Sequence, residues 1–169
     1  MRKCLSLVVA TCALAAVVAT PALSAGSPHF IKSASSATLS GSSLTCKFKE
    51  AGLASGSVET VTCSATQTVI YECVNGGNKN PAASNKKSFT RTVSKSGTFT
   101  ADRNGNIVGS LTLSPRSASS VGFSCPPGQT VTFVSVSYSN VRVVDSTSGA
   151  SISLPGTFSY KNPAAPPVR

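Results

Sequence analysis

The chain of 169 residues contains no tryptophan and only one histidine, His29. A single histidine cannot form a histidine-based metal site, and any Ser-His-Asp triad would have to use it. His29 lies close to the expected start of the mature chain, where we expect it to be exposed. The scarcity of histidine therefore argues against a metalloenzyme and against a conventional serine hydrolase.

Carboxylates are also scarce, because the sequence has five Asp and Glu residues but fifteen Lys and Arg residues, for a formal net charge of +10. The five are Glu50, Glu59, Glu72, Asp102 and Asp145. Glycoside hydrolysis requires two carboxylates that face each other across a cleft, and this sequence forces no pair together. We expect Glu50 and Glu59 at the surface near one hairpin end, and Glu72 on an outward strand position. The sequence predicts a protein that is not an enzyme and holds no metal or other cofactor.

The first 25 residues have the three parts of a secretory signal peptide: a basic start, an apolar run and small residues ending at Ala25. Cleavage after Ala22 or Ser24 is an alternative. No later segment is long and apolar enough to span a bilayer. We therefore expect a secreted, extracellular protein with a single domain at 26–160 and a disordered, proline-rich tail at 161–169.

Four cysteines remain after the signal peptide: Cys46, Cys63, Cys73 and Cys125. An even number in an exported protein predicts disulfides. Cys63 and Cys73 lie on one expected strand, roughly 33 Å apart, far beyond the ~7 Å that a disulfide spans. One remaining scheme is Cys46–Cys63 with Cys73–Cys125, and the other is Cys46–Cys73 with Cys63–Cys125. We prefer the first, in which Cys46 and Cys63 face each other across a hairpin.

Short segments in which apolar residues alternate with Ser and Thr are separated by Gly, Asn and Pro turns. The pattern predicts strands at 43–50, 58–74, 88–94, 97–102, 106–114, 130–144 and 151–160, and a further strand at the end of 26–40. Asn104-Gly105 indicates a hairpin, a parity change predicts a bulge near Ser139-Asn140, and 88–94 is expected at a sheet edge. The sequence thus predicts an all-β, disulfide-stapled antiparallel β-sandwich, immunoglobulin-like in architecture, with seven to nine strands.

The segment YECVNGGNKNPAASNKKSF, at 71–89, gathers amides and lysines behind a cysteine. Its polar candidates for binding are Asn75, Asn78, Lys79, Asn80, Asn85, Lys86 and Lys87. In one interpretation, its Gly, Asn and Pro residues serve only the geometry of a wide loop that leaves a disulfide-anchored strand. In the other, the polar and cationic side chains form a contact surface, since loops on rigid β scaffolds often bind ligands.

The positive charge also has two interpretations. Without residues 1–25, thirteen basic and five acidic residues remain, for a net charge of +8. Such a charge attracts anionic cell-wall or extracellular polymers, or it only maintains solubility. The loop contains no aromatic residue between Tyr71 and Phe89, which argues against specific nucleic-acid binding. We predict a non-catalytic binding or surface-associated module for an anionic extracellular polymer. The alternative is a secreted inhibitor or toxin that acts on a protein partner.

Three stretches of the chain resemble a group of small exported actinobacterial proteins. They are 47–53 (KFKEAGL), the pattern YxCVNxGxKNPxAxNK at 71–86, and Ser124-Cys125-Pro126 followed by VSYSNV at 136–141. The resemblance spans most of the expected mature chain. It implies export, the pairing of Cys73 with Cys125, and a 71–89 segment that is a shared feature of the fold. It carries over no activity and no catalytic residues.

Overall fold

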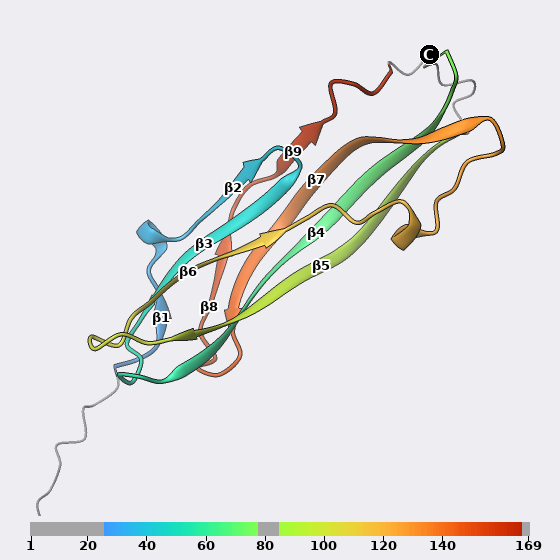
Figure 1. The fold of residues 1–169 in the computed structure, drawn as a ribbon. Coiled ribbons are helices and arrows are strands. Elements are labelled where there is room, and N and C mark those ends of the chain that lie inside the picture. The colour runs from blue at the N-terminus through green and yellow to red at the C-terminus, as the bar shows by residue number, and fades with distance from the viewer. Residues whose placement is uncertain (1–25, 78–84, 167–169) are drawn as a thin grey trace, which may run out of the picture.

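The computed structural model describes residues 26–77 and 85–166. Within them the chain forms nine β-strands and two short 3-10 helices, arranged as two antiparallel sheets around one core (Figure 1). The predicted all-β, disulfide-stapled sandwich is confirmed, and its nine strands lie within the predicted range. The arrangement is compatible with an immunoglobulin-like architecture. The predicted signal peptide at 1–25 lies outside the described residues.

The first sheet is organised around its central strand, β3. Its strands are β1 (His29–Phe30), β2 (Ser36–Ser40), β3 (Ser43–Ala51) and β6 (Ile107–Leu113). β3 pairs antiparallel with each of the other three strands. The 3-10 helix η1 (Lys32–Ala34) lies between β1 and β2. Even-numbered residues of β3, from Leu44 to Glu50, point into the core.

The second sheet contains the two longest strands of the described chain. Its strands are β4 (Val58–Asn75), β5 (Lys86–Thr100), β7 (Gln129–Asp145), β8 (Ser151–Leu154) and β9 (Phe158–Lys161). β4 lies between β5 and β7, and β8 and β9 pair with different stretches of β7. The 3-10 helix η3 (Ser119–Val121) precedes β7. No helix among the described residues has the length and apolar character needed to cross a membrane.

The predicted bulge in the second long strand is confirmed. Thr66 pairs with Ser139 whereas Ser64 pairs with Arg142, so β7 has an extra residue there, and Asn140 adopts a φ of 52°. A bulge moves the following side chains to the opposite face of the strand. Val141 is therefore buried in the same core as the residues that precede the bulge.

The two disulfides are Cys46–Cys63 and Cys73–Cys125, the pairs of the preferred scheme. The expected reason for the first pair is wrong, because Cys46 and Cys63 are not hairpin partners. Cys46 lies in β3 of the first sheet and Cys63 in β4 of the second, so the bond joins the two sheets through the core. The chain between β3 and β4 crosses from one sheet to the other instead of folding back within one.

The predicted Asn104-Gly105 hairpin is also wrong, although the turn itself is present. The Gly105 N–H donates to the Asp102 carbonyl oxygen at 3.0 Å, but β5 pairs with β4 and β6 pairs with β3. The turn therefore connects the two sheets. The strands expected at 88–94 and 97–102 are a single strand, β5, because Ser94 to Gly97 stay in register with β4. β6 pairs with β3 and β5 pairs with β4. In both cases these distant strands, and not the neighbouring turn, determine where the strand lies.

The expected disordered tail at 161–169 is wrong at its start. Lys161 pairs with Ser135 as the last residue of β9. The Asn162 side chain then donates to the Phe133 carbonyl oxygen at 2.8 Å, and the Asn162 backbone donates to the Val134 carbonyl oxygen at the same distance. These bonds hold the chain after β9 against β7.

Candidate functional site

The structure distributes charge very unevenly between the core and the surface. Four of the five carboxylates are buried, namely Glu50, Glu59, Glu72 and Asp145, and the exception is Asp102. None of the eleven described cations is buried: Lys32, Lys47, Lys49, Lys86, Lys87, Arg91, Lys95, Arg103, Arg116, Arg142 and Lys161. The expectation that Glu50 and Glu59 lie at the surface is wrong, whereas Glu72 takes the expected outward position but is buried there. As a result, the surface is more basic than the composition suggests.

Three of the buried carboxylates form what we call the carboxyl cluster: Glu50, Glu59 and Asp145, where β3 ends, β4 begins and β7 ends. Each has a local hydroxyl or turn as partner. Ser148 Oγ donates to Glu50 Oε1 at 2.7 Å, and Ser57 Oγ donates to Glu59 Oε1 at 2.6 Å.

Asp145 organises the turn that follows β7. Its Oδ1 accepts the Thr147 backbone N–H at 2.8 Å and the Ser148 backbone N–H at 3.3 Å. Its other oxygen, Oδ2, and Glu50 Oε2 are both buried and have no hydrogen-bond partner among the described residues.

The pKa of Glu50 is raised to about 7, mainly by burial and also by the nearby negative charges of Asp145 and Glu59, while the Ser148 hydrogen bond opposes the shift. Such an environment also occurs at catalytic carboxyls. However, Glu50 and Asp145 have no solvent-exposed surface, so they do not face a cleft that a substrate enters. Among the described residues, no group of three or more His, Cys, Asp or Glu side chains is arranged to hold a metal ion.

The described part of the predicted binding segment separates into different surfaces. Lys86 pairs with Glu72 and Lys87 pairs with Tyr71, so the two lysines point to opposite faces of the second sheet. Asn75 Oδ1 accepts the Gly77 N–H at 3.1 Å, and Asn85 Nδ2 donates to Gln129 Oε1 at 3.2 Å. Both amides thus have local partners at the two ends of the loop. Asn78, Lys79 and Asn80 lie outside the described residues.

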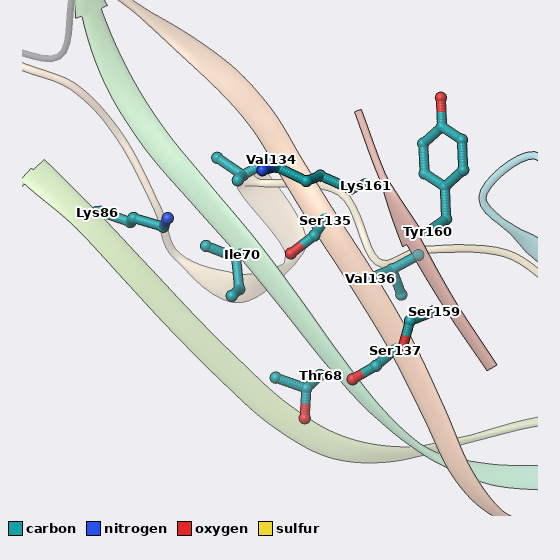
Figure 2. Close-up of a pocket in the computed structure, with 10 residues that line it drawn as sticks. All are labelled: Thr68, Ile70, Lys86, Val134, Ser135, Val136, Ser137, Ser159, Tyr160 and Lys161. Carbon is teal, nitrogen blue, oxygen red and sulfur yellow. The ribbon is translucent and has the colours of Figure 1, made fainter. Parts of the chain in front are cut away.

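Lys86 borders a shallow groove of about 290 Å³ on the outer face of the second sheet, which we call the lysine groove (Figure 2). Lys161 of β9 borders it from the other side. Figure 2 shows the two lysine side chains extending from β5 and β9 toward the middle of the groove, where Ile70 lies. Thr68, Ser135, Ser137 and Ser159 line it with hydroxyl groups.

The strand register explains why these side chains meet. Ser135 of β7 pairs with Ile70 of β4 on one side and with Lys161 of β9 on the other. In the next row on the same face, Ser137 lies between Thr68 and Ser159. A register shift between Ile70 and Tyr71 adjusts the pairing at this point. Because neighbouring strands lie about 4.8 Å apart, β5 and β9 are roughly 14 Å apart, which two lysine side chains can bridge.

Hydroxyl groups continue across this face beyond the lysine groove. The outward residues of β5 from Ser88 to Thr100 are all Ser or Thr, on alternate positions. Two cross-strand pairs are hydrogen-bonded at 2.8 Å, Thr62 with Ser96 and Thr68 with Thr90. Such a face offers donors and acceptors to a hydrated ligand, and the two lysines add positive charge at one place.

Sequence reasoning missed Lys161, because it assigned that residue to a disordered tail. The signal was present, since Phe158, Ser159, Tyr160 and Lys161 alternate like a strand after the Pro155-Gly156 break. Glu72, the register partner of Lys86, lies beside the groove with a buried carboxyl. Its burial has no counterpart in the sequence pattern, which places it on the outward parity of β4.

No family model and no curated protein matches this chain. Two solved structures resemble it weakly. The solution structure of CsgH from R. palustris is 11% identical over 79% of this chain and 91% of that chain, with a TM-score of 0.21. The X-ray structure of the structural-genomics target SoR45 is 12% identical over 85% and 92%, also with a TM-score of 0.21. Likenesses at this level carry no argument about what this chain does.

Proposed function

We propose that this chain is a secreted, non-catalytic binding module that contacts an anionic extracellular polymer through the lysine groove. The observation that carries the proposal is that two lysines border a hydroxyl-lined groove from opposite sides, in a protein that buries four of its five carboxylates. Two disulfides fit a protein that works outside the cell.

The chemistry of the groove favours an anionic chain over a neutral one. Lysine ammonium groups attract phosphate or carboxylate groups, and the hydroxyls of Thr68, Ser135 and Ser137 can hydrogen-bond to the same groups or to sugar hydroxyls. The groove is open and shallow, so it suits a segment of a long polymer better than an enclosed small molecule. The net positive charge of the whole molecule also attracts an anionic polymer toward its surface.

The test is the affinity of the purified protein for two defined polymers, a polyglycerol phosphate and a polygalacturonate, with dextran as a neutral control. The double variant Lys86→Gln and Lys161→Gln is compared with a matched double variant, Lys32→Gln and Lys47→Gln, which removes the same charge elsewhere. We expect the groove variant to lose about five- to tenfold in affinity and the matched variant to lose about twofold or less.

Two results would overturn the proposal. One is an equal loss in both double variants, which would mean that only the total charge matters. The other is equal binding to dextran, which would mean that charge plays no part. Comparison of the two anionic polymers then distinguishes recognition of phosphodiesters from recognition of carboxylates.

A further inference from the structure

Strand β5 forms an unusually long open edge. It spans fifteen residues, and within the described chain it pairs only with β4. None of its fifteen residues is buried. The side of β5 that faces away from β4 therefore presents a row of backbone N–H and C=O groups to which another strand can pair.

This edge carries cations at a fixed spacing. Lys87, Arg91 and Lys95 recur every fourth residue, so they share one face of β5, and all three are exposed. Arg116, from the segment after β6, adds a fourth cation, and its Nη2 donates to the Phe89 carbonyl oxygen at 3.3 Å. This contact fixes the guanidinium group beside β5.

Two hollows lie beside β5, one at Arg91 and the other at Lys95. One, of about 340 Å³, is lined by Arg91, Arg116 and Ser120 among others. The other, of about 240 Å³, is lined by Lys95, Thr112 and Ser114 among others. Because Arg91 and Lys95 are four residues apart, the hollows repeat at roughly 13 Å along the strand. Each hollow contains at least one cation and at least one hydroxyl.

A second copy of this chain does not suit the edge. If two β5 strands paired antiparallel about Val93, Arg91 of each copy would lie opposite Lys95 of the other. Like charges directly opposite each other on paired strands are destabilising, and edge cations of this kind oppose such self-association. The complementary occupant is a strand with carboxylates at these positions.

We propose that the open edge of β5 binds an extended acidic segment of a partner protein by strand addition, with two carboxylates four residues apart seated in the two hollows. Backbone pairing would supply affinity, and the spacing of the hollows would supply specificity. This site is separate from the lysine groove and does not depend on it. It gives the predicted alternative of an inhibitor or toxin a physical surface for a protein partner.

The test uses synthetic nine-residue peptides, mostly Thr and Val, titrated against the purified protein. The fitting peptide has Glu as its third and seventh residues. One control peptide has Lys at those two places, and another has Glu as its third and sixth residues, which point to opposite faces. Two further peptides repeat the fitting sequence with alternate backbone nitrogens methylated, in the two possible phases.

We expect the fitting peptide to bind at least tenfold more tightly than the Lys and misplaced-Glu controls, and one methylation phase to abolish that gain. Arg91→Glu with Lys95→Glu should reverse the preference in favour of the Lys peptide. Lys86→Gln with Lys161→Gln should leave peptide binding within twofold of wild type, so this test is independent of the polymer test. A circular dichroism melt confirms that each variant is folded.

The proposal is overturned if the fitting peptide does not bind at millimolar concentration. Equal binding of both methylated peptides would exclude strand addition. Equal binding of the misplaced-Glu peptide would exclude the two hollows, and an unchanged preference in the charge-reversed variant would exclude the two cations.

Discussion

The two ends of the sandwich use charged side chains in opposite ways. At one end, the carboxyl cluster points inward, is buried, and is held by serine hydroxyls and a turn. Toward the other end, Lys86 and Lys161 point outward over a groove lined with hydroxyls (Figure 2). The net charge counted from the sequence is therefore less positive than the charge at the surface that a partner would contact.

The two ends also differ in what charge contributes to stability. Buried carboxyls are costly when ionised, so the contribution of Glu50 to stability depends on whether it carries a proton. Exposed lysines contribute little to folding, because water solvates them in both the folded and the unfolded state. We therefore expect changes at the carboxyl cluster to affect stability, and changes at the lysine groove to affect binding.

The largest expected effect lies at the end that carries the loop. The Cys73–Cys125 disulfide closes a loop with a sequence separation of 52 residues. Replacement of both cysteines by Ala should lower the free energy of unfolding by about 4 kcal/mol, because the unfolded chain gains conformational freedom. Denaturant titration of the double variant and of wild type measures the difference. A loss below about 1 kcal/mol would mean that this bond does not hold the end of β4 in place.

A smaller effect is expected from pH at the carboxyl cluster. Between about pH 4.5 and 7, folded Glu50 retains a proton that the unfolded chain has released, so stability falls as pH rises. One pKa unit corresponds to about 1.4 kcal/mol, and after allowance for solvent screening we expect a total loss of about 1 to 3 kcal/mol. Denaturant titrations at pH 4.5, 6 and 7.5 measure it.

The variant Glu50→Gln is the control for this pH dependence. Its amide cannot ionise but can still hydrogen-bond to Ser148, so stability should become nearly constant over the same range. A slope that persists in this variant would assign the titration to another group. A wild-type protein that gains stability as pH rises would contradict the raised pKa of Glu50.

The smallest expected effect on stability is at the lysine groove. Lys86→Gln with Lys161→Gln should change the free energy of unfolding by about 0.5 kcal/mol or less, because Lys161 is exposed and Lys86 is only partly buried. Thermal and denaturant melts measure this change. A loss above about 1.5 kcal/mol would show that these lysines stabilise the folded protein. The two ends would then not differ in their effect on stability.

Much of the fold follows from alternation in the sequence. The long strands β4 and β7 and the bulge near Asn140 are all readable from the parity of apolar residues. Alternation does not indicate which strands pair with each other in each sheet. The Asn104-Gly105 turn is local, whereas the choice of β3 as partner for β6 depends on contacts more than fifty residues away.

The burial of two carboxyls was also readable in the sequence but was missed. Glu50 has the parity of Leu44, Cys46 and Phe48, which predicts an inward side chain. Glu59 likewise has the parity of Val61. The expectation that charges at a strand end lie at the surface outweighed this signal. The lysine groove was beyond reach, because it needs the register of β5, β4, β7 and β9 together.

A salt titration of binding to polyglycerol phosphate tests whether the lysine groove binds phosphate groups. The association constant is measured from about 20 to 500 mM NaCl for wild type and for Lys86→Gln with Lys161→Gln. If the two lysines neutralise phosphates, the logarithm of the constant should fall linearly with the logarithm of salt concentration, and the variant should lose about one to two units of slope. An association constant that does not change with salt concentration would show that the lysines do not neutralise phosphates. An equal slope in both proteins would show that Lys86 and Lys161 are not the groups that do so.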